Sequence, residues 1–425
     1  MRALGRLVPT SWRPGVARLE ATVRNVAVRR IAGRGVVDTA LPWRAYGAPN
    51  AHVFFGYHDI TPFDEAGAHL LAHRVAIGAD PARDPVDLVV LDRETGEMRT
   101  LGRSDLWSWQ MGARLRWLPG GRIAWNALAE PGVYGATIVE AQSGRELARL
   151  ATPLYDVAPS GETGLSLDFA RLQRLRPGYG YARAPDETAA DPCPARAGID
   201  RVRLSDGARE RIVALPEIAA LDPHPTMRGA THYLNHLSFA PDGRRFCLLH
   251  LWLAADGRRR VRLVVLDLDG TVLFHVPGQE HVSHFDWTPD GSALLVFGRL
   301  PGDDRPRYQI VDIASGRRTP VPGAPAEDGH PMFKPGDMRT GSDLPAFVCD
   351  TYPDRSSYRA LFLCESGRAP QRLARFSSPP RLGGERRCDL HPRWSPDGAA
   401  IAVDSAHDGR RALVVVACPA GEGGS

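Results

Sequence analysis

A turn built around proline and glycine recurs seven times along the 425-residue chain. It follows an aromatic or aliphatic run, as in WTPDG and WSPDG, and fits a strand entering a tight hairpin. Proline presets φ, aspartate bonds its own backbone and glycine accepts φ > 0. The glycines of this turn are Gly67, Gly121, Gly161, Gly243, Gly291, Gly336 and Gly398. A second turn follows in most units, at Gly96, Gly144, Gly207, Gly270, Gly316 and Gly367, so each unit contains two hairpins, or four strands.

The spacing of these units predicts one all-β domain. The units fill residues 50 to 418 at about 53 residues each, the period expected of propeller blades. We therefore predict a seven-bladed β-propeller of four-stranded antiparallel blades over residues 48–418. The last unit has no clear fourth strand, and we expect HVFFGY (52–57) to supply it and close the ring, which removes the exposed sheet edge.

Three segments depart from the repeat. We predict a short basic N-terminal arm, helical or extended, over residues 1–47 and a disordered tail over residues 419–425. Roughly residues 170 to 198, rich in Pro, Gly and Arg, interrupt the third unit. They predict a long loop on one face of the ring, and long loops on a rigid scaffold are often functional.

The N-terminal arm carries the excess positive charge of the chain. Residues 1 to 34 hold eight arginines and one glutamate, whereas the remainder is slightly negative. The body is therefore not a nucleic-acid binder by charge. For the arm, a plain solvated extension is favoured over an amphipathic helix that touches a membrane surface or a partner protein. The sequence shows no secretory signal and no stretch that could span a bilayer, so we expect a cytoplasmic protein.

Residue counts and spacings exclude several other chemistries. VVLDLDGTVL resembles the nucleophile motif of haloacid-dehalogenase phosphatases, but it occupies the position of a second hairpin, and Lys334 is the only lysine available. The absence of G-x-S-x-G excludes the nucleophile elbow of a serine hydrolase. The six cysteines show no C-x-x-C spacing and are interpreted as reduced packing residues.

Four histidines occupy one position of the repeat. His236, His284, His330 and His391 each lie five residues before the turn proline, in HLSFAPDG, HFDWTPDG, HPMFKPGD and HPRWSPDG. The innermost strand of a blade borders the central channel, so these rings should converge there. Imidazoles close to one another favour the neutral form, which ligates a divalent metal or accepts a proton. The alternative is that histidine only caps the inner strand by bonding a neighbouring backbone group.

Further polar residues lie near the same strand ends. They are Tyr57, His58 and Asp59 in GYHD; His232, Tyr233 and Asn235 in HYLNHLSF; Asp350, Tyr352, Asp354 and Arg355 in DTYPDRSSY; and Arg387 and Asp389 in RCDLHPRW. Each has an ordinary explanation by packing or by ion pairing. Together they suit an anionic oligosaccharide, because aromatic faces stack on sugar rings and arginine forks bind carboxylates.

The blade repeat resembles the TolB-like propeller class, and the HP-aromatic-SPDG units with channel histidines are similar to the oligogalacturonate lyases. The strings FFGYHD, WSWQMGARLRWLPG, RPGYGYA, HYLNHLSF, TYPDRSSY and RCDLHPRWSPDG resemble, more closely, a group of bacterial propeller proteins. Oligogalacturonate lyases are seven-bladed, mostly cytoplasmic enzymes in which three histidines and a glutamine hold a manganese ion that binds the substrate carboxylate. The resemblance implies His284, His330 and His391 as metal ligands, with Gln110 or His236 as a fourth. Manganese is the implied metal, and calcium and zinc are the alternatives.

The reaction implied by the resemblance is β-elimination from a uronate-containing glycan. The C5 proton is weakly acidic, so a lyase must neutralise the carboxylate, remove the proton and protonate the leaving oxygen. We assign neutralisation to the metal with Arg387 or Arg355, the base to His236 or His232, and the acid to Tyr233 or Tyr352. One alternative is a non-catalytic platform that binds a glycan or a protein at the channel mouth. Another is a glycoside hydrolase with Asp350 and Asp389 as paired carboxylates.

Overall fold

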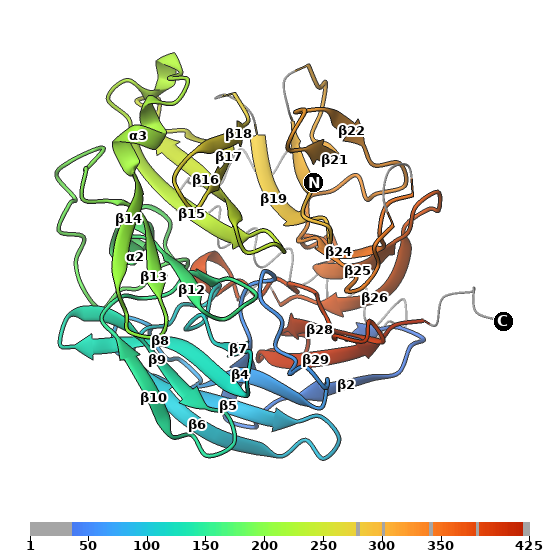
Figure 1. Cartoon of the computed structure of the whole chain (residues 1–425). Coiled ribbons are helices and arrows are strands. Elements are labelled where there is room, and N and C mark those ends of the chain that lie inside the picture. Colours follow the sequence, from blue (N-terminus) through green and yellow to red (C-terminus); the bar gives the residue numbers. More distant parts are fainter. Residues whose placement is uncertain (1–35, 278–280, 300–301, 340–342, 380–381, 420–425) are drawn as a thin grey trace, which may run out of the picture.

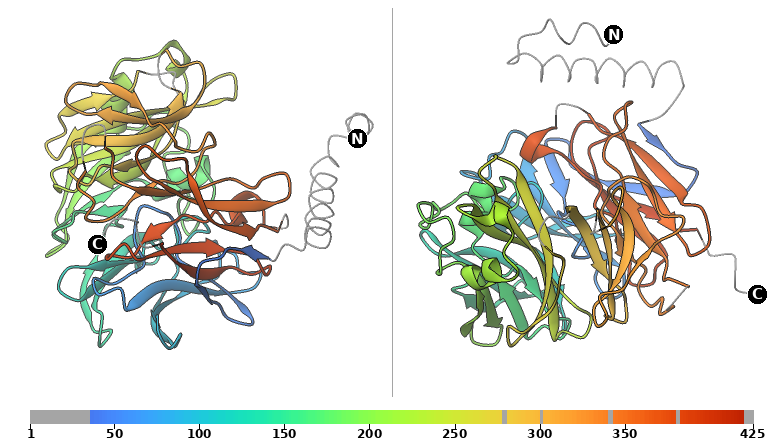
Figure 2. Two further views of the ribbon diagram at one scale, coloured as in Figure 1. Left: turned by 90° about the vertical axis from the view of Figure 1, so that its right-hand side faces the viewer. Right: turned by 90° about the horizontal axis from the view of Figure 1, so that it is seen from above.

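The structure is a ring of seven antiparallel β-sheets (Figure 1). It is a computed structural model that describes residues 36–277, 281–299, 302–339, 343–379 and 382–419. The sheets lie around a common centre in Figure 1, and Figure 2 gives two views of the same ring, each turned by 90°. The predicted seven-bladed propeller of four-stranded antiparallel blades is confirmed.

Each blade takes consecutive strands, beginning with the strand nearest the centre. Blade one contains β3 (Ala51–Phe54), β4 (His69–Ala76), β5 (Val86–Asp92) and β6 (Met98–Ser104), and blade two β7 (Arg116–Leu118), β8 (Arg122–Glu130), β9 (Val133–Glu140) and β10 (Glu146–Leu150). Blade three contains β11 (Asp156–Val157), β12 (Thr163–Ser166), β13 (Gly198–Arg203) and β14 (Arg209–Ala214), and blade four β15 (Thr231–Phe239), β16 (Arg245–Leu253), β17 (Arg259–Asp267) and β18 (Val272–His275). Blade five contains β19 (His281–Trp287), β20 (Ala293–Arg299), β21 (Arg307–Asp312) and β22 (Arg318–Pro320). Blade six contains β23 (Met332–Phe333), β24 (Phe347–Asp350), β25 (Tyr358–Cys364) and β26 (Gln371–Ser377), and blade seven β27 (Arg393–Trp394), β28 (Ala400–Ser405) and β29 (Ala412–Ala417).

The glycines of the repeated turns mark the hairpins of the blades. All thirteen have φ between 65° and 86°, the left-handed region that glycine adopts without steric cost. The first turn of each unit joins the first and second strands of a blade, and the second turn joins the third and fourth. The two turn signals in the sequence therefore give the blade boundaries directly.

The strand that closes the ring is not the predicted one. HVFFGY (52–57) does not complete the last blade, because Ala51–Phe54 is the innermost strand of blade one. Blade seven is completed instead by β2 (Trp43–Tyr46), which pairs antiparallel with β29 and lies beside it in Figure 1. β1 (Val37–Asp38) adds a fifth strand to blade six by pairing with β26. Residues 37–46, assigned from the sequence to the arm, thus form part of the propeller.

Helical segments occupy connections between strands. The interruption of blade three lies between β12 and β13 and contains α2 (Phe169–Leu175), whose first turn is capped by the Asp168 carboxylate. α3 (Leu215–Ala220) and the short 3₁₀ helix η2 (Pro225–Met227) follow β14, and η3 (Gly384–Arg386) precedes β27. Within the interruption, the rings of Phe169 and Tyr181 stack with centroids 4.6 Å apart. The interruption also bonds both neighbouring blades, because Asn126 of β8 donates to the Tyr181 hydroxyl and Arg171 donates to the His232 carbonyl oxygen of β15, each at 2.9 Å.

The hydrophobic core lies between neighbouring blades. One cluster of buried side chains joins blades three, four and five, and another joins blades one, two and seven. The six cysteines are unpaired, and four of them are buried, as expected of packing residues. Among the described residues, no helix has both the length and the apolar composition that crossing a membrane requires. Residues 1–35 of the predicted arm and 420–425 of the predicted tail lie outside the described residues.

Removing the closing strand should destabilise the ring. A variant that begins at residue 48 lacks β2, its pairing with β29 and the hydrogen bond from the Tyr46 hydroxyl to the Arg93 carbonyl oxygen at 2.7 Å. Because the truncation exposes an edge of blade seven, we expect the melting temperature in calorimetry to fall by about 5 °C or more. Because this truncation also removes β1 (Val37–Asp38), the matched control begins at residue 40, which lacks β1 and keeps β2. Equal melting of the two variants would contradict closure by β2.

Candidate functional site

The four histidines of the repeat register meet at the centre of the ring. The ring centroids of His284 and His330 are 4.1 Å apart, and those of His330 and His391 are 4.3 Å apart. His236 joins them through the Tyr57 ring, whose centroid lies 4.8 Å from those of both His236 and His391. All five side chains are buried. We call these residues the channel cluster.

Unusual backbone conformations orient part of this cluster. His236 and His391 have φ of 52° and 48°, in the left-handed region that costs a non-glycine residue roughly 1–2 kcal/mol. The pairing of β15 with β16 also shifts next to His236, so a bulge interrupts the regular alternation of side chains there. Arg114 has φ of 54° and likewise lies five residues before a turn proline, Pro119. Strained residues that the surrounding fold holds in place are typical of functional sites.

Asp350 holds two histidines of the cluster. Its Oδ1 accepts the backbone N–H of His330 and lies 2.8 Å from His330 Nδ1, and its Oδ2 accepts the backbone N–H of His391 at 3.0 Å. The Nδ1 atom of His391 lies 2.7 Å from the Gly56 carbonyl oxygen. Because these partners are acceptors, each Nδ1 carries a proton and each Nε2 keeps its lone pair when the ring is neutral. With both oxygens occupied, Asp350 is a positioning residue and not one half of a glycosidase carboxylate pair.

Two neighbouring imidazoles are held in the same way. His284 Nδ1 lies 2.9 Å from Asp328 Oδ1, and His58 Nδ1 lies 3.1 Å from the Pro331 carbonyl oxygen. The His58 ring centroid is 5.2 Å from that of His330. Four adjacent imidazoles therefore have Nδ1 bound to an acceptor, which leaves Nε2 as the atom available to a ligand.

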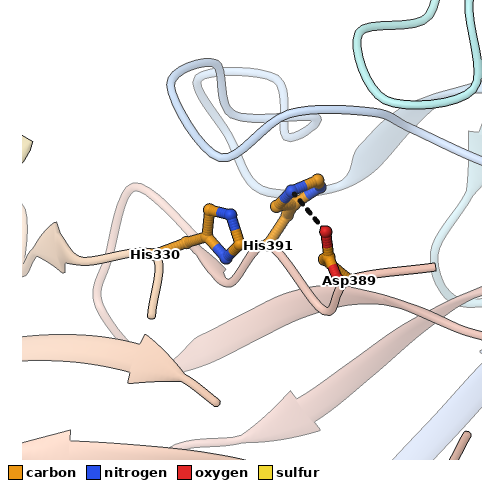
Figure 3. Close-up of side chains that lie close together, drawn as sticks. All are labelled: His330, Asp389 and His391. Atoms are coloured by element: carbon orange, nitrogen blue, oxygen red, sulfur yellow. Dashed lines mark ion pairs between the residues drawn. The ribbon is translucent and has the colours of Figure 1, made fainter. Parts of the chain in front are cut away.

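Two of these Nε2 atoms are buried without a partner. In the part of the chain that the structure describes, Nε2 of His330 and Nε2 of His391 form no hydrogen bond. His330, His391 and Asp389 each offer one ligand atom, and these three atoms all lie within 4.8 Å of one another; His391 Nε2 is 4.0 Å from Asp389 Oδ2 (Figure 3). Buried acceptors without a partner are costly, and a cation bound between these atoms would satisfy them. Two imidazole nitrogens and a carboxylate oxygen suit a divalent transition metal.

Two arginines keep the Asp389 carboxylate ionised. One oxygen lies 2.7 Å from a guanidinium nitrogen of Arg359, and the other accepts from Arg387 Nε at 2.6 Å. Burial raises the pKa of Asp389, but Arg359 and Arg387 together lower it by more, so that its pKa lies well below the usual range. The group therefore offers a negatively charged oxygen at neutral pH.

Arg387 also connects the cluster to the channel mouth. Its Nη2 donates to the Tyr179 hydroxyl at 2.7 Å, and its guanidinium carbon lies 5.9 and 6.0 Å from the ring centroids of Tyr179 and Tyr352. Tyr352 is 37% exposed, whereas Tyr179 is buried. The Tyr352 ring centroid lies 6.2 Å from that of His330. An anionic sugar that reaches the cluster would pass aromatic faces and a guanidinium.

Other predicted site residues lie apart from the channel cluster. His232 is buried against His250, with Nδ1 2.9 Å from His250 Nε2, in a separate polar network. Gln110 Nε2 donates to the carbonyl oxygens of Glu385 and Arg387 at 3.0 and 2.8 Å, so its amide fixes the segment before Asp389. Arg355 is exposed, and Tyr233 is buried beside Arg176.

The sequence places Tyr57 and Asp389 near the strand ends, but only the structure gives their positions in the site, and it adds Tyr179, which the sequence does not single out. The Tyr57 ring contacts His58, His236, His330, His391 and Tyr179. Tyr179 comes from the interruption of blade three, and no repeat position marks it. The one usable signal is that GYHD and RCDLH lie close to the ends of inner strands, where side chains reach the channel.

No model of a known protein family matches the chain, and no curated protein sequence matches it. Solved structures do match. An oligogalacturonate lyase from Vibrio parahaemolyticus aligns with a TM-score of 0.60 at 14% identity, over 91% of this chain and 99% of that one. An oligogalacturonate lyase in complex with manganese aligns with a TM-score of 0.61 at 17% identity, over 91% of this chain and 98% of that one. This chain has the fold of oligogalacturonate lyases. TolB from Acinetobacter baumannii also aligns, with a TM-score of 0.36 at 15% identity over 84% of this chain and 83% of that one.

The buried imidazoles should make the folded state sensitive to acid. Burial first, and then neighbouring positive charges, lower the pKa values of His58, His236 and His391 well below the usual value. Below about pH 6.5 the unfolded chain binds protons at these rings and the folded chain does not, so the free energy of unfolding falls as the pH falls. Asp286 and Asp168 act in the opposite direction, because burial raises both pKa values, that of Asp286 to about 7. They are outnumbered, because burial also lowers the pKa values of five further histidines, His73, His232, His250, His284 and His407.

The test is thermal unfolding of metal-free protein at constant ionic strength. We expect the melting temperature to be lower by about 5 °C or more at about pH 5 than at about pH 7.5. The substitution His58→Gln should reduce this difference, because it removes one of the groups that titrate only in the unfolded chain. Identical melting at both pH values would contradict the neutral cluster.

Proposed function

We propose that this chain is a metal-dependent lyase that cleaves uronate-containing oligosaccharides by β-elimination. The observation that carries the proposal is the pair of buried, unpartnered Nε2 atoms of His330 and His391 beside the Asp389 carboxylate. The fold supports it, since one protein that shares the fold is an oligogalacturonate lyase in complex with manganese. Arg387 and Tyr352 at the mouth support an acidic sugar as the ligand.

The residues present fit a divalent metal. His330, His391 and Asp389 would hold the ion, with His284 adjoining them at the His330 ring. Of the metals considered from the sequence, manganese is favoured by the lyase of the same fold in complex with that ion, and zinc also accepts two imidazoles and a carboxylate. Calcium prefers oxygen ligands alone. When bound, such an ion would supply Lewis-acid stabilisation of the substrate carboxylate.

His236 is the residue placed to remove the C5 proton. Burial and nearby cations lower its pKa, so the ring is neutral and able to accept a proton at neutral pH. Its Nε2 lies 3.5 Å from the Tyr57 hydroxyl. Burial raises the pKa of Tyr57, so this hydroxyl stays protonated and can donate to the leaving oxygen. The pair takes the acid and base roles that the sequence also offered to His232 and Tyr233, which lie outside the cluster.

Loss of the imidazole ligands should abolish both metal binding and turnover. We expect elemental analysis to find about one manganese per wild-type chain after loading, and His330→Ala and His391→Ala to lose it. Both variants should also fail to release unsaturated product, detected by mass, from a panel of uronate oligosaccharides. His69→Ala is the control, because His69 is a partly exposed histidine that bonds Asp64. Its metal content and activity should match those of the wild type.

Two outcomes would contradict the proposal. Full activity in either ligand variant would show that the imidazoles do not serve the reaction. Wild-type protein that binds oligosaccharide without metal and without turnover would favour the non-catalytic platform.

Asp350 should affect metal affinity through the two histidines that it holds, His330 and His391. In Asp350→Asn the side chain keeps its shape but cannot accept all three N–H groups, so we expect metal affinity to fall by about 10- to 100-fold. Competition against a chelator measures this directly. Asp354→Asn is the matched control, because Asp354 pairs with Arg375 at the surface. Equal affinity of the wild type and Asp350→Asn would show that the carboxylate does not orient the ligands.

A further inference from the structure

Two arginines beside the channel have no acidic partner. Arg176 follows α2 in the interruption of blade three, and Arg259 begins β17 of blade four. Among the described residues, neither forms an ion pair with a carboxylate, and Arg176 Nε is buried without a hydrogen-bond partner. Arg259 is exposed, whereas several buried arginines of the ring pair with a carboxylate, as Arg114 does with Asp59 at 2.9 Å. The charges of Arg176 and Arg259 are therefore available to an anion from outside the chain.

Both arginines lie next to the hydroxyl of Tyr233. Tyr233 belongs to β15, is 1% exposed, and its hydroxyl has no hydrogen-bond partner among the described residues. Burial raises the pKa of Tyr233, and Arg259 and Arg176 lower it, which places both positive charges close to the ring. We call Arg176, Arg259 and Tyr233 the arginine cluster. It combines two guanidinium groups with one orphaned hydroxyl donor.

The arginine cluster adjoins the channel cluster through Tyr179. The guanidinium carbon of Arg176 lies 4.3 Å from the Tyr179 ring centroid. That ring is 5.7 Å from the His236 ring, and its hydroxyl accepts from Arg387 at 2.7 Å. One aromatic ring therefore separates the two groups, and its face is of the kind on which a sugar stacks.

We propose that the arginine cluster is a second anion subsite, which binds the carboxylate of a neighbouring uronate in the same oligosaccharide. The inference rests on the proposed function and extends it to substrate recognition. A buried guanidinium nitrogen, Arg176 Nε, and a buried hydroxyl without hydrogen-bond partners are costly, and a carboxylate would satisfy both through charge-assisted hydrogen bonds. The subsite would select chains with acidic groups on more than one sugar. An inorganic oxyanion offers the same chemistry and is distinguished in the test.

The test measures binding apart from turnover. A galacturonate trimer and its methyl ester are titrated calorimetrically into full-length protein with chelator present, so that metal-dependent cleavage does not consume the ligand. We expect Arg176→Gln and Arg259→Gln each to weaken binding of the acidic trimer by about tenfold or more, and to change binding of the ester by less than about twofold. Arg176→Lys should restore part of the affinity, which a purely structural role of Arg176 would not require.

The control is Arg174→Gln, two residues earlier and within α2, where the partly exposed Arg174 pairs with Asp186 at 2.7 Å. It should leave the binding of both trimers unchanged. The subsite is overturned if wild-type protein does not bind the acidic trimer, or if the Arg176 and Arg259 variants bind it as tightly as the wild type does. It is also overturned if inorganic sulfate binds as tightly as the trimer, which would indicate a site for small anions.

The two proposals fail in different ways. Binding of the trimer that depends on Arg176, in a protein that releases no unsaturated product when loaded with metal, would contradict the lyase and keep the subsite. Product release together with binding that does not depend on Arg176 would contradict the subsite alone.

Discussion

The Asp350 carboxylate is the group on which the centre of the ring depends. It accepts N–H groups from His330 in blade six and from His391 in blade seven, so one side chain fixes the ring of the first and the backbone of the second. Other neighbouring blades are joined in a similar way. Asp404 accepts the backbone N–H groups of Phe55 and Gly56, Asp156 that of Phe239, and Asp286 that of Phe333. Carboxylates near the inner strands thus set how each blade meets the next, and at Asp350 the same device sets the spacing of two imidazoles.

Burial gives these contacts their chemical consequence. Burial lowers the pKa values of His58, His236, His284 and His391, and acceptors on Nδ1 leave Nε2 as the atom available to a ligand. Asp389 stays ionised in the same environment only because two arginines lie within ion-pairing distance. The Tyr57 ring contacts both the imidazoles beside Asp389 and His236, the proposed base. One ring therefore joins the part of the site that would hold a cation to the part that would move a proton.

The sequence predicts the blades because each blade contains its own proline and glycine turns. It predicts that the four histidines meet because each lies five residues before the turn proline of its blade. It misses the closing strand, since Trp43–Tyr46 has no turn beside it and pairs with residues almost a whole chain length away. His232 and His236 are four residues apart on β15, so regular alternation would put both side chains on the same face of the sheet. Only His236 reaches the channel. A positive φ and a bulge at His236 make that difference, and no residue type signals them. Asp389 lies two residues before His391 in the sequence, but only the fold brings both beside His330 of blade six.

The central claim is that buried imidazoles present Nε2 atoms to one cation in the channel. Pulsed electron paramagnetic resonance of protein loaded with manganese(II) tests it most directly, because the spectrum reports nitrogen nuclei bound to the ion. The account predicts coupling to imidazole nitrogens in the wild type, reduced in His391→Ala and unchanged in His69→Ala. Manganese whose spectrum shows no coupling to imidazole nitrogen, in protein that retains its fold, would contradict it.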